Sequence, residues 1–190
     1  MRSALIKAGV ELARAGGPEA VVLREATRIV GVVPNAAYRH FADRDALLAA
    51  VRSEAVRGLA QRMADGMSRV RAGPRTPTGA GLRLQAVGRA YLDFARTEPG
   101  LFDTAFAVTE HPTSGEGDEP QPFELLQAAL DDLVQAGLLD PARRPEIGYP
   151  TWDAVHGLAV LLRGPLRSLS DREKTWLEAQ TLAFIGAALS

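Results

Sequence analysis

The sequence predicts an all-α protein. Apolar residues recur at helical spacing through most of the chain, and no segment alternates polar and apolar residues as a half-buried strand would. Short segments rich in glycine and proline separate the helical ones. A chain of 190 residues is long enough for one or two domains with a sizeable core. We expect about nine helices, with three in an N-terminal domain over residues 1–48 and the rest in a larger domain over residues 49–190.

The first three helices are predicted from stop and start signals. An amphipathic helix ends at residues 16–18, Gly-Gly-Pro, which is a strong stop signal. Residues 23–30 and 34–41 then form two short helices joined by a tight turn over residues 31–33. Gly31 suits a left-handed helix end, and Pro34 suits the first turn of a new helix. The apolar positions of the first helix are Ala4, Leu5, Ala8, Leu12 and Ala13.

The later helices follow the same signals. Asp43 is placed to cap a long helix over residues 46–70, and Ser170 with Glu173 forms a capping box for the last helix. A loop is predicted over residues 73–81, where two prolines and three glycines oppose regular structure, and another over residues 111–120. Further helices are predicted over residues 82–97, 101–108, 123–136, 148 or 149 to 162, and 170–189.

The two short helices are a candidate helix-turn-helix. The second helix carries mostly polar side chains, which suits an outer face that meets base edges and phosphates. An ordinary helical corner fits this segment equally well. We expect Tyr38 and His40 to contact phosphates, with Tyr38 also able to touch a thymine methyl group, unless Tyr38 packs against the first helix. Arg39 is suited to a guanine edge or to a solvated surface position.

Other residues complete the candidate nucleic-acid surface. Asn35 and Ala36 lie near the start of the second helix, where bases are read, whereas Arg24 and Arg44 start neighbouring helices and suit phosphates. Phe41 is expected to lock the short helix onto the core. The full candidate set is Arg24, Pro34, Asn35, Ala36, Tyr38, Arg39, His40 and Arg44.

The net charge of −1 hides an uneven distribution. Residues 1–72 carry 12 Lys and Arg against 7 Asp and Glu, a net charge of +5, whereas residues 73–190 carry 10 against 16, a net charge of −6. A basic N-terminal part lets one end of the molecule face phosphates while the other end repels them. The asymmetry is modest, so it supports the nucleic-acid interpretation without establishing it.

Several other classes of function find no support. The chain has no cysteine, which excludes disulfides, thiol nucleophiles and thiolate metal sites. His40, His111 and His156 are scattered and form no metal constellation. We see no nucleophile–base pair and no phosphate loop, so we expect neither an enzyme nor a cofactor. With no secretory signal and no membrane-spanning run, we expect a cytoplasmic protein without a membrane partner.

The N-terminal segment resembles the DNA-binding domain of the tetracycline-repressor (TetR) family of transcriptional regulators. The resemblance covers roughly residues 3–52 and is most specific in residues 38–41, Tyr-Arg-His-Phe, at their distance from Gly31. Residues 91–106 and 152–159 resemble one branch of the family, in which a tryptophan precedes a Val-His-Gly-Leu segment. The other matching N-terminal residues are Ala8, Gly16, Gly17, Leu23, Arg24, Glu25, Val32, Arg44, Leu47 and Leu48.

The resemblance implies a homodimeric regulator that occupies a palindromic operator and releases it when a small-molecule effector fills a C-terminal cavity. This behaviour is that of a repressor, although the sequence does not separate repressor from activator. The dimer would form through the last two helices, over residues 149–162 and 170–189. The same small and apolar residues also suit the core of a monomer; they are Ala154, Leu158, Leu161, Trp176, Ala183, Ile185 and Gly186.

Eight residues are candidates for the effector cavity. They combine apolar surface with a few polar groups, as small-molecule sites do, although an aromatic stripe at helical spacing also suits an ordinary core. His156 fits a ligand contact, a dimer contact or a buried imidazole. The candidates are Tyr91, Phe94, Phe102, Phe106, Phe123, Leu126, Trp152 and His156.

Departures from the family pattern open an alternative. Val22 and Val33 stand where threonine or serine commonly caps the second helix and the recognition helix, and each lost cap costs about 1 kcal/mol. Thr27 replaces a usual alanine, and Ile29 replaces a residue that is often charged. The alternative is therefore a helical adaptor or interaction protein that has lost specific DNA binding.

Overall fold

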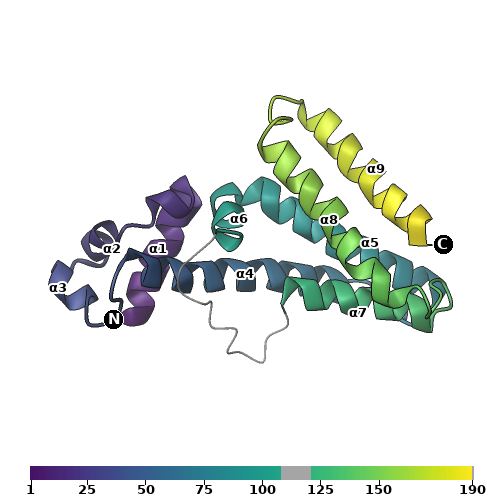
Figure 1. The fold of residues 1–190 in the computed structure, drawn as a ribbon, viewed down its shortest axis with the longest axis horizontal. Helices are drawn as coiled ribbons and strands as arrows, with labels where there is room; N and C mark the ends of the chain where they lie inside the picture. Colours follow the sequence, from purple (N-terminus) through teal and green to yellow (C-terminus); the bar gives the residue numbers. More distant parts are fainter. Residues whose placement is uncertain (108–120, 190) are drawn as a thin grey trace. The chain divides into compact units, whose positions relative to one another are not determined.

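The computed structural model describes residues 1–107 and 121–189, and these residues contain helices and no strand (Figure 1). The prediction of an all-α fold is confirmed. The predicted loop over residues 111–120 and residue 108 lie outside the described residues, whereas the helix predicted over residues 101–108 is wrong after Ala105, where it ends. The elements are α1 (Arg2–Gly16), a 3₁₀ turn (Pro18–Ala20), α2 (Leu23–Val30), α3 (Pro34–Ala37), α4 (Arg44–Ser68), α5 (Pro77–Thr97), α6 (Pro99–Ala105), α7 (Pro122–Gln135), α8 (Arg144–Arg163) and α9 (Asp171–Leu189).

The described chain divides into two compact units. The first unit comprises the described parts of Met1–Gly58 and Thr97–Glu119, and the second comprises those of Leu59–Arg96 and Pro120–Ser190. The chain passes from one unit to the other within α4 and again near the end of α5. The predicted boundary after residue 48 lies inside α4, so it interrupts a continuous helix.

The first unit is built around α1, which packs against both α2 and α6. Its core is made of apolar side chains, to which the amphipathic pattern of α1 contributes Leu5, Ala8 and Ala13. The guanidinium of Arg14 on α1 pairs with Glu98 before α6 at 2.8 Å, and Arg52 on α4 donates to the carbonyl of Ala105 at 3.0 Å. Residues distant in the sequence, in α6, therefore join the N-terminal helices in one unit.

The second unit consists of the C-terminal part of α4 with α5, α7, α8 and α9. α8 packs against α7 on one side and α9 on the other. Two half-buried arginines tie the helices together, because Arg83 on α5 and Arg144 on α8 reach Asp132 and Asp131 on α7, both at 2.6 Å. The apolar faces of these helices enclose the space described in the next section.

The second helix of the candidate helix-turn-helix is shorter than predicted. The predicted helix over residues 34–41 is wrong after Ala37, where α3 ends and a turn over residues 38–40 follows. The N–H of His40 donates to the carbonyl of Ala37 at 2.8 Å, a bond to the third preceding residue that tightens the chain. This turn brings Phe41 into the core, where its side chain is 3% exposed, as predicted.

The predicted loop over residues 73–81 is also wrong from Pro77 onward, because α5 begins there. Thr76 caps the helix by accepting the N–H of Gly79 on its hydroxyl oxygen at 3.1 Å, and Pro77 occupies the first turn. A Cβ atom at Gly79 would lie 1.9 Å from the carbonyl oxygen of Gly73. The glycine in this segment thus permits close approach of the chain rather than interrupting the helix.

The start of α8 differs from the predicted 148 or 149, since the helix begins at Arg144 and includes Pro150 in its interior. The Arg144 side chain binds Asp131 and the carbonyl of Gln127 on α7. These bonds hold the first turn in place, although a proline removes one helical hydrogen bond later on.

The predicted caps are confirmed. Asp43 accepts the N–H of Ala46 at 2.7 Å, and Ser170 and Glu173 exchange the two bonds of a capping box, at 2.8 and 3.4 Å. Val22 and Val33 occupy the N-cap positions of α2 and α3 without a side-chain hydrogen bond, as expected. The first orphan N–H groups of both short helices therefore lack the usual cap.

Candidate functional site

The turn between α2 and α3 sets the direction of the candidate recognition helix. Gly31 has φ 76° and ψ 34°, the left-handed conformation predicted for it. The N–H of Val32 reaches back to the carbonyl of Thr27 at 3.0 Å and closes the end of α2. Thr27 itself is buried, and its hydroxyl donates to the carbonyl of Arg24 at 2.7 Å, so the departure from alanine leaves no unsatisfied group.

Polar side chains around α3 point to solvent. Tyr38 is 58% exposed, which does not fit the alternative that it packs against the first helix. Arg39 and His40 in the following turn are exposed, as are Pro34 and Asn35, whereas Ala36 is half-buried. Within the described residues, none of these polar side chains has a hydrogen bond or an ion pair. Arg24 on α2 is likewise exposed and unpaired within the described residues.

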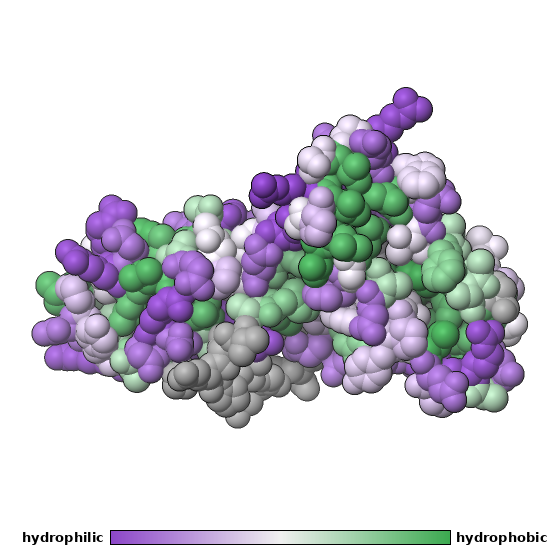
Figure 2. All heavy atoms as spheres, turned by 45° about the horizontal axis from the view of Figure 1, so that its top comes forward, coloured by the Kyte–Doolittle hydropathy of each residue, from purple (hydrophilic) through white to green (hydrophobic). Residues whose placement is uncertain are grey.

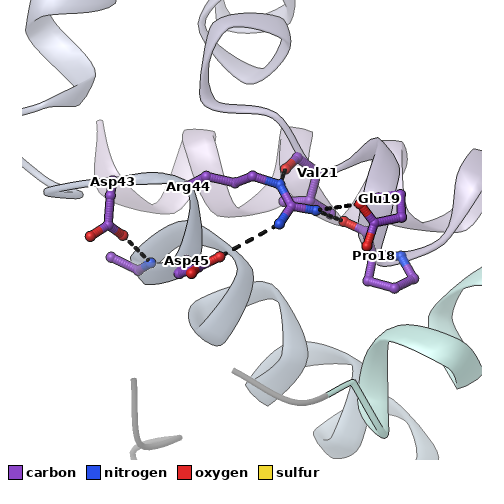
Figure 3. Close-up of polar contacts among 7 residues, drawn as sticks. Pro18, Glu19, Val21, Asp43, Arg44 and Asp45 are labelled. Carbon is purple, nitrogen blue, oxygen red and sulfur yellow. Dashed lines mark hydrogen bonds and ion pairs between the residues drawn. The ribbon is translucent and has the colours of Figure 1, made fainter. Parts of the chain in front are cut away.

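Arg44 differs from the other candidates because its guanidinium is engaged inside the first unit (Figure 3). Its Nε donates to the carbonyl of Val21 at 3.0 Å and its Nη2 to that of Pro18 at 2.8 Å. Ion pairs to Glu19 at 3.3 Å and to Asp45 at 3.5 Å complete its contacts. Arg44 therefore joins the start of α4 to the segment that leads into α2.

The second unit contains a cavity of about 390 Å³. This volume lies within the range of small-molecule sites, roughly 300–1,000 Å³. No charged side chain lines the cavity among the described residues. The lining residues are Met63, Gly81, Leu84, Gln85, Val87, Gly88, Tyr91, Leu126, Leu133, Gly137, Leu138, Thr151, Trp152, Val155, Leu182, Ile185, Gly186 and Leu189.

The polar groups of this lining are mostly satisfied by the protein itself. The Tyr91 hydroxyl lies 2.6 Å from Nδ1 of His156, and the Thr151 hydroxyl donates to the carbonyl of Ile147 at 2.8 Å. Burial raises the pKa of Tyr91 and lowers that of His156, the latter opposed by the charge of Asp153. The phenol therefore keeps its proton, and the tautomer of the imidazole sets which of the two groups donates the hydrogen bond.

Three of the eight predicted cavity residues line this space, namely Tyr91, Leu126 and Trp152. His156 lies behind Tyr91, and Phe123 stacks on Tyr149 with ring centroids 4.8 Å apart. The remaining three lie elsewhere. Phe94 is buried beneath the guanidinium of Arg62, while Phe102 and Phe106 pack on each other in the first unit at 4.9 Å.

Most of the lining was not foreseen. Leu84 and Val87 share a side of α5 with Tyr91, and this 3–4 spacing was the one available signal. Nothing local distinguishes Met63 on α4, or Ile185 on α9, from ordinary core or dimer residues. Their positions depend on how five helices pack.

No group of histidine, aspartate and glutamate side chains capable of holding a metal ion occurs in the part of the chain that the structure describes. None of the described helices has the length and apolar character needed to cross a membrane.

Comparison with known proteins identifies the family. A model described as "Tetracyclin repressor-like, C-terminal domain" matches residues 84–182, and one described as "Bacterial regulatory proteins, tetR family" matches residues 5–51. No curated protein matches the chain in sequence.

Several solved structures share the fold. A protein of unknown function from Rhodococcus sp. RHA1 superposes with a TM-score of 0.72 at 21% identity, covering 99% of this chain and 94% of that one. A putative tetR family transcription regulator from Shewanella sp. PV-4 gives 0.63 at 14% identity, covering 99% and 97%. PfmR, a TetR family transcriptional regulator from Thermus thermophilus, gives 0.58 at 17% identity, covering 97% and 96%. At such identities the likeness shows the fold alone.

The helix-turn-helix with its exposed polar face, joined to a helical unit with an internal cavity, defines a DNA-binding transcriptional regulator. The chain belongs to the tetracycline-repressor family, as the sequence indicated. Proteins of this family are generally not enzymes.

Proposed function

We propose that this regulator is a cytoplasmic repressor that binds a palindromic operator as a homodimer and leaves it when a small molecule occupies the cavity. The observation that carries the proposal is the set of exposed, unpaired polar side chains around α3, in the same chain as a cavity without a charged lining residue among the described ones. The first supplies contacts to DNA, and the second supplies a place for an effector.

The DNA contacts proposed here follow from exposure and chemistry. Arg39 and Asn35 are suited to base edges, whereas Tyr38, His40 and Arg24 are suited to phosphates. Pro34 and Ala36 bring the backbone of α3 close to the groove. Arg44, which the sequence alone assigned to a phosphate, is better described as a positioning residue, because its guanidinium already holds two backbone carbonyls.

Homodimerisation is proposed through α8 and α9. Only Ile185 and Leu189 of α9 are buried in the described chain, whereas Trp176 is 60% and Phe184 70% exposed. Figure 2 shows hydrophobic residues gathered over the part of the surface that α8 and α9 form. A second copy covering these faces would bury them. A dimer on a palindromic site needs its two recognition helices about 34 Å apart, the spacing of successive major grooves.

The proposed release mechanism is a shift between two arrangements of the dimer. A ligand that binds one arrangement more tightly than the other increases its population, and DNA binding falls if that arrangement separates the recognition helices incorrectly. The long helix α4 continues from the first unit into the second, and α5 leads from Tyr91 to α6. These connections are the proposed routes of coupling.

We also propose that the C-terminal domain belongs to the branch with the Trp and Val-His-Gly-Leu segment. Trp152 of this segment lines the cavity, and His156 supports Tyr91 from behind. The segment would then be retained for the effector site. The ligand set proposed on this basis is Tyr91, Leu126 and Trp152, with Phe94, Phe102, Phe106 and Phe123 omitted.

Selection from a random duplex library tests the DNA-binding part of the proposal. We expect a palindromic consensus, preferred over scrambled DNA by about a thousandfold or more in fluorescence anisotropy. Arg39→Ala should weaken binding mainly through one base pair, whereas the control Arg75→Ala, an exposed arginine in the loop before α5, should leave it unchanged. Weak, salt-sensitive binding without a consensus would contradict the proposal.

Size-exclusion chromatography with light scattering tests the dimer. We expect Phe184→Glu to give a monomer, because a charge in a buried apolar interface is strongly unfavourable. The matched control is Ile29→Glu, which places the same charge on an exposed apolar position of α2. A dimeric Phe184→Glu variant would exclude this face.

The adaptor alternative is kept because of one observation, the absence of side-chain caps at Val22 and Val33. Uncapped short helices fray more readily, and a frayed α3 would bind DNA without specificity. Failure of the library selection, together with a folded dimer, would favour this alternative.

A further inference from the structure

The cavity of the second unit shares a wall with a second hollow. A groove of about 820 Å³ lies between the end of α4, the outer side of α5 and part of α9. Gln85 on α5 and Leu182 on α9 line both the cavity and the groove. These two side chains therefore lie between the two hollows, and a ligand group beside Gln85 would be at the edge of the cavity that faces the groove.

The two hollows differ in charge. The cavity has no charged side chain in its described lining, whereas the groove has five arginines and three acidic residues. A hydrocarbon part would suit the first space, and an anionic group would suit the second. The charged residues of the groove are Arg62, Arg69, Arg71, Arg89 and Arg96, with Asp65, Asp93 and Glu178.

The acidic residues of the groove are already engaged. Asp93 pairs with both Arg96 and Arg62, the latter at 3.8 Å, and Asp65 accepts a hydrogen bond from Gln61. Burial raises the pKa of Glu178, and nearby Asp93 adds to the rise, although the charge of Arg96 opposes it. The carboxylates thus leave part of the positive charge of the groove uncompensated.

Arg89 is the uncompensated arginine nearest to the junction. Its Nη2 donates to Oε1 of Gln85 at 3.4 Å, and Gln85 lies one helical turn before it on the same face of α5. Arg69 and Arg71 are exposed and have no hydrogen bond or ion pair within the described part of the chain. An anion beside Gln85 would replace the long, weak bond of Arg89 with a charge-assisted one.

We propose that the effector is an amphipathic anion, with an apolar body in the cavity and a carboxylate or similar oxyanion beside Gln85 and Arg89. This inference rests on the proposed function, since it names the class of ligand for the same cavity. Arg69 and Arg71 add positive potential along the groove. A neutral apolar molecule would use the cavity alone, and a cation would be repelled at its mouth.

The test uses four simple probes with the purified full-length protein and no DNA. Isothermal titration calorimetry compares decanoate, decanol and decylamine, which share one chain, with acetate, which has the anion alone. We expect decanoate to bind about tenfold more tightly than decanol, with decylamine weaker than both and acetate without measurable binding. The preference for decanoate should shrink as salt is raised from low to high.

Two variants test where the anionic group and the apolar body of the ligand bind. Arg89→Gln should bring decanoate to the affinity of decanol and leave decanol unchanged, whereas the control Arg75→Gln should alter neither. Gly81→Leu adds a side chain at a cavity position where a Cβ meets no atom within 4 Å, so we expect weaker binding of both probes. Circular dichroism checks that each variant is folded.

Four results would overturn the inference. The first three are equal affinity for decanol and decanoate, an equal loss of both in Arg89→Gln, and no binding of any chain-bearing probe. The fourth is unchanged binding by Gly81→Leu, which would place the apolar body elsewhere. None of these results bears on operator selection, so failure of the ligand class and failure of the proposed function are distinguishable.

Discussion

The two units of this regulator use polar side chains in opposite ways. In the first unit, the polar groups around α3 are exposed and unpaired in the described chain, with Arg39 as an example. In the second unit, the polar groups of the cavity are satisfied internally, as Tyr91 is by His156 and Thr151 by Ile147. DNA would thus bind polar side chains around α3 that have no partner in the described chain. An effector would instead bind in the cavity, whose polar groups already have partners.

The largest expected effect is a loss of stability when a core residue of the segment after α3 is replaced, compared with the replacement of an exposed residue nearby. We expect Phe41→Ala to lower the free energy of unfolding by about 3–5 kcal/mol, because it removes a buried aromatic side chain and leaves a void. Tyr38→Ala, three residues earlier and exposed, should change stability by less than about 0.5 kcal/mol while weakening DNA binding.

Urea denaturation followed by circular dichroism measures the first effect, and anisotropy with the selected operator measures the second. Similar destabilisation by the two substitutions would show that Tyr38 has a structural role, and the distinction between surface and core in this segment would fail.

The next largest effect is a difference between two arginines of the first unit, one expected to matter for stability and the other for DNA binding. Arg44→Ala should cost about 1–2 kcal/mol of stability, because the carbonyls of Pro18 and Val21 lose their charged donor in a partly exposed site. Arg39→Ala should leave stability unchanged and reduce operator affinity. Thermal unfolding and anisotropy on both variants give the comparison.

A variant that keeps the charge distinguishes positioning from a direct phosphate contact. Arg44→Lys retains the charge but not the fork of donors that reaches two carbonyls. We expect it to remain destabilised. Full stability with normal operator affinity would indicate that charge alone matters and that Arg44 acts on DNA.

The same contrast explains what could be predicted from the sequence. Gly31, Pro34 and Phe41 follow local rules of helix ends and core anchoring, and the structure has each where those rules predict. The engagement of Arg44 could not be predicted, because its partners lie 23 and 26 residues away.

Few of the residues that line the cavity could be predicted from the sequence. Tyr91 and Trp152 were predicted because aromatic residues mark the branch and the helix side, but their neighbours come from five helices. The start of α5 at Pro77 differs from the predicted loop over residues 73–81, because the prolines and glycines that predict a loop here permit a helix start, at which Gly79 allows contact with Gly73. Tertiary contacts decided each of these positions.

A smaller effect is expected when a capping side chain is added at the start of α3. Val33→Ser should raise the free energy of unfolding of the first unit by about 1 kcal/mol, because serine can accept an orphan N–H of α3. The control Ile29→Ser makes the same change at an exposed position inside α2, where no cap is possible, and should give no gain. If Val33→Ser and Ile29→Ser shift the urea midpoint equally, the gain comes from the added surface hydroxyl and not from capping.

The smallest effect concerns pH and the second unit. Burial lowers the pKa of His156 below its usual 6.5, so below that pH the unfolded chain binds the proton more readily than the folded one. Stability should therefore be complete above about pH 7 and should fall by less than about 1 kcal/mol as the pH decreases towards 5.

Comparing His156→Gln with the parent chain over this pH range isolates the contribution of the imidazole, since glutamine does not titrate. An exposed histidine, His40, provides the control, because His40→Gln should leave the pH profile of the second unit unaltered. A parent profile as flat as that of His156→Gln would contradict the lowered pKa of His156, because the folded and unfolded chains would then bind the proton equally.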